Sequence, residues 1–598
     1  MIERLIDVAL GRTPADVVLK NGTFVNVFTG QVQRGDIAIA CGKVAGIGAY
    51  EGEREYDIRG KVAVPGLIDA HVHIESAQLS PEEFARLVMP RGTTTVIADP
   101  HEIVNVCGVD GAQYIARAAQ NTPLEVKLML PSCVPATPFE TSGACLTGEQ
   151  TAALLQGDAF FGLGEFMNAP GVLGKDAEAL QKLEGARAAG KLVDGHAPGL
   201  EGEALNAYIA AGISTDHECT CAAEAAEKAS RGMYVHLREG SAACNVAENC
   251  GAVTAANLRR FLFCTDDRHA ADICAHGHLD ATLRTAVQAG MSPVWAVIIA
   301  TLNAAECYGL RGKGAIAPGY DADIAVFDDL ENFHCAFTFK NGELAAIEGM
   351  PLFGTGQKYL PDCVRDTVHV GGISPDSFRI SLKGGYANVI RVQPGSLVTG
   401  RSVRAVASAG GDVDLRGTDL LKLAVVERHR GSGNIGLGLA EGCGLWGGAI
   451  ATSVAHDSHN IIVLGDNNED MAAAVQELAR IGGGMAVVGR GRTASLPLDI
   501  AGLMSSLPAE ECAARAAALD EAAYELGFSR EFSPFMALSF LALPVIPSLK
   551  LTDRGLFDVE KFDFCPLDAD PPQGENGASD SDARSAGDAG AAGEPGEE

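Results

Sequence analysis

The stretch VPGLIDAHVH, residues 64–73, decides how this chain is expected to fold. It is typical of a buried β-strand that ends in a pair of histidines. Alternate side chains of a strand point to the same face, so His71 and His73 should project together from the strand end. Two imidazoles at this separation can hold one divalent metal ion. The alternative is a chance pair, in which one histidine packs in the core and the other is exposed.

The region that follows this stretch repeats its pattern. Between residues 62 and 310, short β-rich runs alternate with alanine-rich stretches of helical composition. This alternation is typical of βα units, and eight of them in about 240 residues match a (β/α)8 TIM barrel. Reactive groups of such barrels lie at the C-terminal ends of the strands. The eight predicted strands end near His73, Asp99, Pro131, Glu165, His196, His217, His236 and Asp266.

Both flanks of the barrel region have strand-and-turn patterns. Asn-Gly and Gly-Lys turns separate short apolar runs in residues 17–48, and similar runs return at 322–327 and 337–342. Residues 1–61 and 311–359 therefore predict one small β-sandwich built from both flanks, with the catalytic barrel of residues 62–310 inserted in it.

The rest of the chain predicts a further domain and a tail. Residues 360–565 have mixed α and β character, with buried strands expected at 461–464 and 485–488 and a helix at 471–480 between them. Residues 566–598 are rich in Gly, Ala and acidic residues, which predicts a disordered acidic tail. The expected fold class is α/β: a metal-dependent TIM barrel inserted in a small β-sandwich, plus a C-terminal α+β domain.

The composition restricts the partners of the protein. The 598 residues carry a formal net charge of −31, which repels phosphate backbones and anionic lipid. A small-molecule substrate is therefore expected, and nucleic acid and membranes are not. The 16 cysteines show no dense framework and the N-terminus has no apolar signal core, so a cytoplasmic protein is expected. A closed homo-oligomer is the expected assembly.

Further candidate metal ligands stand at the ends of other predicted strands. A buried carboxylate such as Glu165 needs a compensating partner, and a position between two cations would supply one. The alternative is a structural salt bridge. His196 and His217 end strands five and six, although each alone would more often be a hydrogen-bonded core histidine. Together with the first pair they provide two imidazoles for each of two metal ions.

Two adjacent carboxylates follow the last predicted strand. Asp266 and Asp267 should point to opposite sides of an extended chain, so different roles are expected for them. One can ligate metal and move a proton, and the other can contact substrate. The alternative for Asp267 is a helix N-cap.

Three other polar segments leave more than one interpretation open. Residues 99–102, DPHE, and residues 238–241, REGS, follow predicted strands, and each is a substrate-binding group or a solvated loop with local ion pairs. In the C-terminal domain, His456 and His459 have a spacing that zinc sites use but that simple loops share. The roles of this pair and of His429 stay open.

At this level of detail the chain resembles a known family. The strand-one His-x-His, the later single histidines and the strand-eight Asp resemble the amidohydrolase superfamily. Several segments resemble the bacterial adenine deaminases within it, over about residues 15–560. These segments are DPHEI at 99–103, GEFM at 164–167, REGSA at 238–242, CTDDR at 264–268, ERH at 427–429 and residues 448–460.

The resemblance implies a binuclear metal site and a reaction in purine metabolism. Adenine and water would give hypoxanthine and ammonia, with two divalent ions, Mn²⁺ or Fe²⁺, as cofactors and Zn²⁺ as an alternative. His71 and His73 would bind one metal ion with Asp266. The second would be bound by His196 and His217, and Glu165 would bridge the two ions.

The chemistry of that reaction suggests roles for the remaining residues. A metal-activated hydroxide would attack C6 of adenine, and Asp266 would pass the hydroxide proton to the leaving amine. Since attack destroys the aromaticity of the ring, N1 must be protonated, and Glu102 or Glu239 could act as the acid. The candidate substrate-binding residues are Asp99, Arg238, Ser241 and Asp267.

Two other functions compete with this one. Another cyclic amidohydrolase, acting on a ring amide or an N-acyl group, would keep the metals and change the substrate loops. A non-catalytic relative with a scaffold role would be expected to lose metal ligands, whereas every expected ligand position is filled in this chain.

Overall fold

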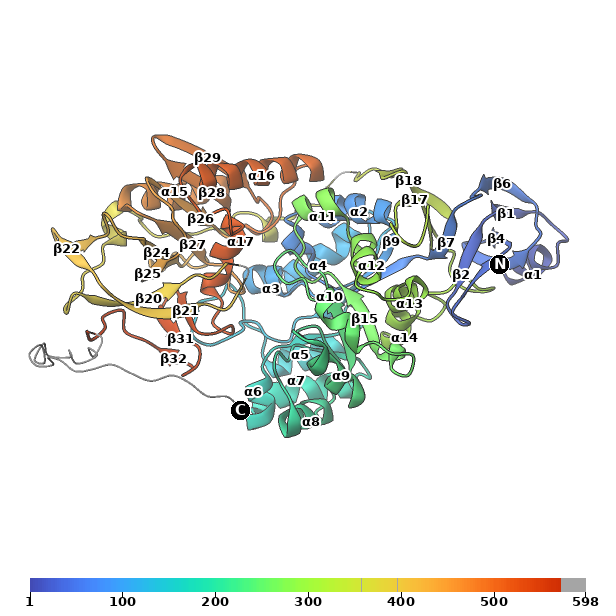
Figure 1. Ribbon diagram of the computed structural model, residues 1–598, viewed down its shortest axis with the longest axis horizontal. Coiled ribbons are helices and arrows are strands. Elements are labelled where there is room, and N and C mark those ends of the chain that lie inside the picture. The colour runs from blue at the N-terminus through green and yellow to red at the C-terminus, as the bar shows by residue number, and fades with distance from the viewer. Residues whose placement is uncertain (357, 395, 572–598) are drawn as a thin grey trace, which may run out of the picture.

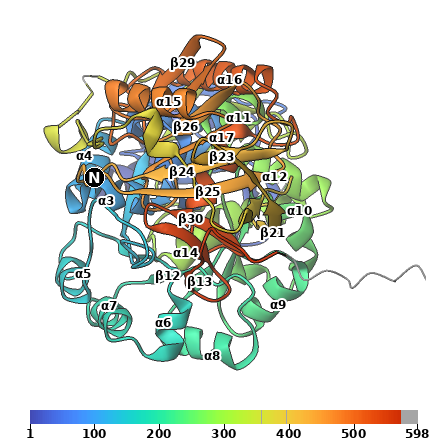
Figure 2. The same cartoon turned by 90° about the vertical axis from the view of Figure 1, so that its left-hand side faces the viewer.

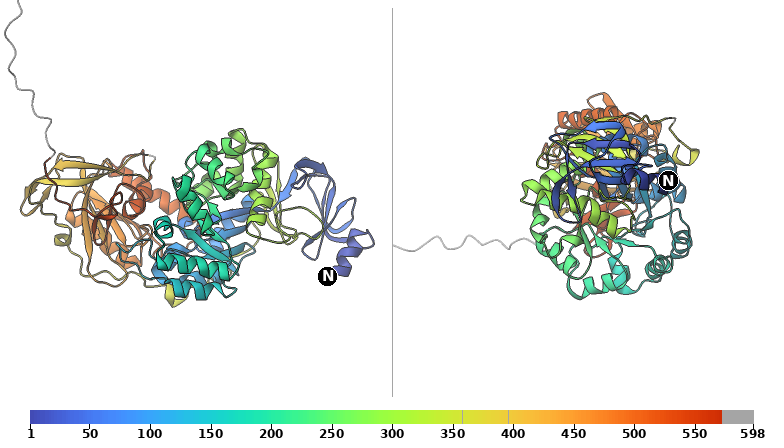
Figure 3. Two further views of the ribbon diagram at one scale, coloured as in Figure 1. Left: turned by 90° about the horizontal axis from the view of Figure 1, so that it is seen from below. Right: turned by 90° about the vertical axis from the view of Figure 1, so that its right-hand side faces the viewer.

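The computed structural model describes residues 1–356, 358–394 and 396–571. Three parts lie in a row along the long axis of the molecule (Figure 1). The N-terminal sheets, in blue, occupy one end, and the C-terminal domain, in yellow to red, occupies the other. The barrel lies between them, and the view from below shows the same order (Figure 3).

The central part is a barrel of parallel strands. Strands β8 to β12 form one run and β13 to β15 another, with parallel pairing inside each run. Backbone hydrogen bonds join the runs, because the Ser214 amide donates to the Val193 carbonyl and the Asp266 amide donates to the His71 carbonyl. The strands are β8 (Leu67–Val72), β9 (Thr93–Ala98), β10 (Glu125–Leu130), β11 (Gly162–Phe166), β12 (Val193–Gly195), β13 (Thr215–Asp216), β14 (Tyr234–Arg238) and β15 (Phe261–Cys264).

The predicted TIM barrel is therefore confirmed, and burial explains why it was predictable. Every residue of β8, β9, β11 and β15 is buried, since helices cover the outside of a parallel barrel. The main covering helices are α2 (Pro81–Val88), α4 (Val109–Ala119), α5 (Gly148–Leu155), α7 (Ala177–Ala188), α8 (Gly202–Ala210), α9 (Ala222–Ser230), α11 (Ala270–His276) and α12 (Leu279–Gln288).

Two largely antiparallel sheets form the N-terminal part, and the larger of them takes strands from both flanks of the barrel. One has the order β5-β4-β1-β6 and the other β19-β18-β17-β16-β7-β2-β3. Their strands are β1 (Ala15–Lys20), β2 (Thr23–Asn26), β3 (Gln31–Arg34), β4 (Asp36–Ala40), β5 (Lys43–Gly48), β6 (Gly52–Asp57), β7 (Val62–Pro65), β16 (Ile324–Phe327), β17 (Cys335–Lys340), β18 (Glu343–Ile347) and β19 (Met350–Pro351).

One boundary differs from the sequence prediction. Residue 62 was expected to begin the barrel, but β7 pairs with β16 in the seven-stranded sheet. Residues 62–68, VAVPGLI, contain no polar side chain, so hydrophobic periodicity alone could not divide this run. The change occurs at Gly66, whose amide donates to the Asp323 carbonyl, and the barrel begins one residue later.

The C-terminal domain is centred on an eight-stranded sheet of order β21-β20-β25-β24-β27-β26-β28-β29. The strands expected at 461–464 and 485–488 and the helix expected between them are present as β27, β28 and α15. The sheet and its main companions are β20 (Tyr386–Arg391), β21 (Gly400–Ala405), β24 (Leu420–Val426), β25 (Ile435–Glu441), β26 (Gly448–Thr452), β27 (Ile461–Gly465), β28 (Gly484–Gly489), β29 (Arg492–Pro497), α15 (Asn468–Ile481), α16 (Ala509–Glu525) and α17 (Pro534–Ser539).

This domain packs against the barrel at the end where the site residues gather. Helix α16 contacts α11 and α2, and the end-on view shows the C-terminal sheet in front of the barrel helices (Figure 2). Within the described residues, none of the helices combines the length and apolar character needed to cross a membrane.

The first residues of the expected disordered tail are attached to the C-terminal domain. Residues 566–571 are held against β20, because the Asn388 amide donates to the Leu567 carbonyl at 2.8 Å and the Ala569 amide to the Tyr386 carbonyl at 3.0 Å. Backbone pairing to an existing strand explains this attachment despite the polar composition. The remainder of the expected tail, residues 572–598, lies outside the described residues.

Candidate metal centre and substrate cavity

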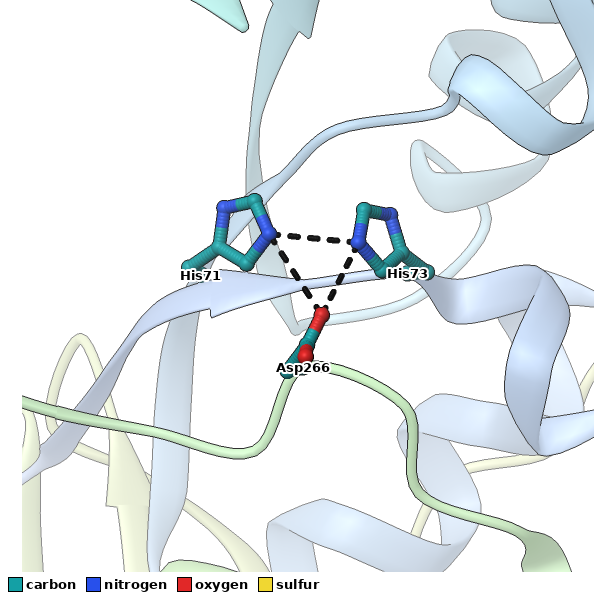
Figure 4. Close-up of side chains that lie close together, drawn as sticks. All are labelled: His71, His73 and Asp266. Atoms are coloured by element: carbon teal, nitrogen blue, oxygen red, sulfur yellow. Dashed lines mark hydrogen bonds and ion pairs between the residues drawn. The ribbon is translucent and has the colours of Figure 1, made fainter. Parts of the chain in front are cut away.

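Three predicted ligands converge at the junction of the first and last barrel strands. His71 lies on β8, His73 directly follows it, and Asp266 follows β15 (Figure 4). The two Nε2 atoms are 3.2 Å apart, and Oδ1 of Asp266 lies 3.0 Å from Nε2 of His73 and 3.6 Å from that of His71. Asp266 has a φ of 56°, a left-handed conformation that is uncommon outside glycine and recurs at functional sites.

The second pair of histidines is joined to the first by one carboxylate. Oε2 of Glu165 lies 2.8 Å from Nδ1 of His196 and 3.3 Å from Nε2 of His217. The other oxygen, Oε1, lies 3.2 Å from Nε2 of His73. One oxygen of Glu165 therefore faces each pair, which is the arrangement that a bridging ligand requires.

The hydrogen bonds around these ligands suit metal binding. Nδ1 of His73 lies 2.7 Å from the carbonyl oxygen of Asp99. A carbonyl only accepts, so Nδ1 carries a proton, and Nε2 is the nitrogen that would bind a metal ion. Such a partner on the far nitrogen is typical of histidines that bind metals.

The electrostatics of the cluster also suit a cation. Burial raises the pKa of Glu165, but hydrogen bonds from His101, His196 and His217 hold it well below its usual value. Burial likewise lowers the pKa of His217, and Glu165 raises it to about 9. Divalent ions at this position would replace protons that the carboxylates otherwise hold on the histidines.

Asp99 supports the bridging glutamate from behind. Its Oδ2 accepts a hydrogen bond of 2.8 Å from the amide of Glu165, and the residue is fully buried. A Cβ at Gly164 would lie 2.1 Å from the same oxygen, so the close approach requires glycine. Predicted as a substrate-binding residue, Asp99 lies outside the cavity lining in the structure.

Arg238 lies beside the predicted proton carrier. Its Nη1 donates to Oδ2 of Asp266 at 2.7 Å, and its Nη2 donates to Oε2 of Glu218 at 3.0 Å. Burial raises the pKa of Asp266, but the Arg238 charge and the histidines hold it well below its usual value. Glu218 was not singled out from the sequence, although it directly follows the candidate ligand His217.

The cluster of candidate metal ligands opens into a cavity of about 290 Å³ between the barrel and the C-terminal domain. We call the two sides of this cavity the barrel wall and the C-terminal wall. The charged members of the barrel wall are His73, His101, Glu102, Glu165, His196, His217, Glu218, Arg238, Asp266 and Asp267. The C-terminal wall consists of Leu397, Val398, His456, Asp457, Phe540, Leu543, Val545, Ile546 and Pro547.

Two predicted site residues are not brought to this cavity. Glu239 and Ser241 line a separate cavity of about 520 Å³ together with Asp272 and Thr285. Ser241 donates a hydrogen bond to Asp272, and Glu239 accepts one from Thr285. Strand alternation gives the reason, because Arg238 faces the barrel interior and its neighbour Glu239 therefore points the other way.

Glu102, which was suggested as a possible acid, lies in the cavity wall with both oxygens paired. Its two oxygens accept hydrogen bonds from Nδ1 of His456, at 2.6 Å, and from Nε2 of His459. Burial raises the pKa of Glu102, but these histidines hold it well below its usual value. Two donors on its oxygens favour the ionised carboxylate, so proton donation by Glu102 stays a prediction that this geometry does not favour.

Two further residues of the cavity, His101 and Asp457, occur in the sequence motifs without an assigned role. Nδ1 of His101 lies 3.3 Å from Oε1 of Glu165, and its Nε2 lies 3.8 Å from Oδ1 of Asp457. His101 begins helix α3 (His101–Cys107), so the search for polar residues at strand ends did not single it out. His429 lies elsewhere, with Nε2 donating to the Ser458 carbonyl at 2.7 Å.

The described residues thus provide two neighbouring ligand sets for metal. One contains His71, His73 and Asp266, and the other, which shares His71, contains Glu165 and His217; Nδ1 of His196 lies 2.8 Å from Oε2 of Glu165. The predicted ligands all lie in one cluster.

Two family models match the chain. The model of the amidohydrolase family covers residues 62–348, and that of the adenine deaminase C-terminal domain covers residues 396–563.

Full-length relatives show the same similarity. The adenine deaminase of Nitratidesulfovibrio vulgaris Hildenborough is 51% identical over 570 residues, which cover 94% of this chain and 98% of the relative. Adenine deaminase 2 of Carboxydothermus hydrogenoformans is 48% identical, with 95% and 99% covered. Among solved structures, the β-aspartyl dipeptidase of Fervidobacterium islandicum AW-1 aligns with a TM-score of 0.45 and 19% identity, over 57% of this chain and all of that one.

Proposed function

This chain belongs to the adenine deaminase family of amidohydrolases, and on that premise we propose that it converts adenine and water into hypoxanthine and ammonia. The observation that carries the proposal is the cluster of four histidines, Glu165 and Asp266 at the mouth of the barrel, which opens into a cavity closed by the C-terminal wall. A volume of about 290 Å³ suits a small ring system rather than a polymer.

We assign the metal ligands as the geometry suggests. His71, His73 and Asp266 would hold one divalent ion, His196 and His217 the second, and Glu165 would lie between them. Mn²⁺ or Fe²⁺ is the proposed cofactor, with Zn²⁺ as the alternative. When bound, two such ions make water acidic enough to supply a nucleophile near neutral pH.

The residues of the chain then handle protons and orientation. Asp266 is ionised because Arg238 donates to its Oδ2, so its Oδ1 can take a proton from the nucleophile. The same oxygen can deliver that proton to the amine as the bond from C6 to nitrogen breaks. Asp99 holds the backbone of Glu165 and thereby positions the oxygens between the two histidine pairs.

The C-terminal wall suits a neutral, flat substrate. Seven of its nine residues are apolar, which matches the faces of a heteroaromatic ring, and Asp457 adds a carboxyl group with a partner-free oxygen among the described residues. We assign Arg238, Asp267 and Asp457 to the polar edge of the substrate. Ser241 and Glu239, which lie in the other cavity, are left out of this assignment.

We also propose a cytoplasmic location and a homo-oligomeric assembly. The first is supported by the 16 cysteines, all unpaired, which persist as thiols in a reducing compartment. The second is supported only by the general prevalence of symmetric oligomers among enzymes. Light scattering of the purified protein would test the assembly.

Ammonia release from free adenine tests the proposed function. The protein is loaded with Mn²⁺ or Fe²⁺, its metal content is measured, and a Glu165→Gln variant is assayed beside it. Turnover that requires metal and is lost in the variant is the expected result. A protein that carries two metal ions and leaves adenine unchanged would overturn the substrate assignment and direct the assays to ring amides and N-acyl groups.

A further inference from the structure

The loop between β26 and β27 brings two histidines of the C-terminal domain onto a barrel residue. Residues 455–460 reach Glu102 on α3, so that each oxygen of this carboxylate accepts from a different ring. Glu102, His456 and His459 are all buried, with exposed fractions of 2%, 6% and 1%. A buried carboxylate with both oxygens paired has one orientation and one charge state.

The hydrogen bonds of His459 define its tautomer. The backbone amide of Ala455 donates to Nδ1 of His459 at 3.2 Å, so this nitrogen is the acceptor. The proton of the neutral ring therefore sits on Nε2, which donates to Glu102. Burial lowers the pKa of His459 to about 4, which keeps the ring neutral in this role.

His456 differs from His459 in both charge and position. Its Nδ1 donates to Glu102 at 2.6 Å, and its ring stacks on Phe540 with centroids 4.4 Å apart and an interplanar angle of 17°. Burial lowers the pKa of His456, but Glu102 raises it to about 9, so the ring is an imidazolium near neutral pH. It lines the substrate cavity, and its Nε2 has no hydrogen-bond partner among the described residues.

These observations match what the deamination step needs. Attack at C6 places negative charge on the adjacent ring nitrogen, and a proton donor must reach that nitrogen. Of the described groups around the cavity, Glu102 is ionised and accepts, whereas Nε2 of His456 has an N–H to give. Both nitrogens of His101 face carboxylates, Glu165 at 3.3 Å and Glu102 at 3.5 Å, so Glu102, the partner of His456, lies one ring width from Glu165.

We propose that His456 is the acid that protonates the purine ring, and that Glu102 and His459 are positioning residues that keep it charged and oriented. This inference rests on the proposed adenine deaminase function. It assigns the acid role to a residue of the C-terminal domain, more than 350 positions from the barrel carboxylate that supports it.

The proton balance of the step closes. The oxygen of water bonds to C6 while Nε2 of His456 gives its proton to N1. The remaining hydroxyl proton passes through Asp266 to the amine, the bond between C6 and the amine nitrogen breaks, and ammonia leaves. The product keeps the proton on N1 and forms a carbonyl at C6. The other proton of the consumed water restores His456.

The same three side chains could instead hold a further metal ion, since their ligand atoms lie close together. The geometry disfavours this, because a ligating nitrogen must be free of its proton. Nε2 of His459 carries a proton that cannot move to Nδ1, since Nδ1 accepts a hydrogen bond from the Ala455 amide. The two rings also donate to different oxygens of Glu102 and do not point toward one common metal position.

A His456→Gln variant tests the proposal against a His334→Gln control. The side chain of His334 is 59% exposed between β16 and β17, outside the cavity lining. The expected loss in kcat for the His456 variant is about 10²- to 10⁴-fold with an unchanged metal content, as for removal of a general acid. The control should retain wild-type kinetics. A kcat within a few-fold of wild type in His456→Gln would overturn the acid role.

Two further measurements separate the acid role from a structural one. Imidazole added to His456→Ala should restore part of kcat, which a merely misfolded loop would not permit. His459→Phe should lower kcat less than His456→Gln and leave KM within a few-fold, since it acts through Glu102. A third metal equivalent that disappears in His459→Phe would overturn the proposal in favour of a metal site.

The wild-type assay keeps this proposal distinct from the proposed function. If metal-loaded wild type does not deaminate adenine, the function itself fails. If wild type is active and His456→Gln equals it, only the assignment of the acid fails.

Discussion

The barrel wall and the C-terminal wall of the cavity can be compared residue by residue. Ten charged or titratable side chains line the barrel wall, whereas two of the nine residues in the C-terminal wall, His456 and Asp457, are titratable. The barrel wall holds buried carboxylates and imidazoles that need cations or protons to balance them. In the C-terminal wall the charge of His456 is balanced by Glu102, which belongs to the barrel wall. The difference suggests that the barrel wall supplies the chemistry and that the C-terminal wall supplies the shape and one proton.

Metal removal should produce the largest effect and act through the barrel wall alone. Chelation is expected to abolish ammonia release, and two equivalents of Mn²⁺ or Fe²⁺ per chain should restore it. The measurement is activity against metal content. Activity in protein with less than about 0.1 metal ion per chain would contradict the assignment of the histidine clusters to a binuclear centre.

Asp266→Asn tests the proton-transfer role of one barrel-wall residue. The amide keeps a side-chain oxygen but cannot take a proton, so kcat should fall by about 10²- to 10⁴-fold while KM changes little. Asp272→Asn is the matched control, because Asp272 lines the separate cavity with Ser241. Equal losses in the two variants would mean that the effect is structural.

Phe540→Ala examines the C-terminal wall. Stacking of a base on an aromatic side chain is worth about 1–3 kcal/mol, so KM for adenine should rise by roughly 5- to 100-fold. A smaller loss in kcat is expected as well, since the ring also stacks on His456. Phe562, which is 50% exposed in the same domain, provides the control variant. An unchanged KM would show that the substrate does not contact this wall.

Lys550 behind the C-terminal wall should affect stability more than activity. Its Nζ donates to the carbonyls of Leu397 and Phe540, at 2.9 and 3.0 Å, and so ties together two segments of the wall. Burial lowers the pKa of Lys550 from 10.5 to about 7. A neutral amine has two N–H bonds, which match the two carbonyls.

The sign of the resulting pH dependence follows from linkage. Between pH 7 and pH 10.5 the unfolded chain holds a proton on Lys550 that the folded chain has released, so the free energy of unfolding rises with pH. The gain from pH 7 to pH 9 is about 2 kcal/mol. Urea unfolding of Lys550→Met should lack this part of the increase. Lys383→Met, at an exposed position, should retain the increase. If the free energy of unfolding rises equally with pH in wild type and both variants, the lowered pKa of Lys550 is refuted.

The sequence predicted the barrel wall far better than the C-terminal wall. Strand ends are recognisable because a buried apolar run changes abruptly to a polar residue, and all six predicted metal ligands lie at such changes. The same reasoning misplaced Glu239 and Ser241, because the chain leaves β14 at Arg238 and these two side chains face another cavity.

The C-terminal wall has no comparable signal. Its members come from three separate segments, at 397–398, 456–457 and 540–547, which share no period and meet only after the domain has docked. The motif DPHE drew attention to Glu102, but its partners His456 and His459 lie in another domain. Contacts of this kind depend on tertiary packing, which spacing within one segment does not encode.

The pairing of β7 with β16 has a consequence for how the chain is made. The two strands are consecutive neighbours in the seven-stranded sheet, yet Pro65 and its partner Ile324 are separated by the whole barrel. At ordinary rates of synthesis, the ribosome needs on the order of tens of seconds to deliver the second strand after the first. During that interval the nascent N-terminal sheet presents an open edge. The sheet can therefore be completed only after the whole barrel has been translated. A chain released earlier would leave that edge exposed to other chains or to chaperones.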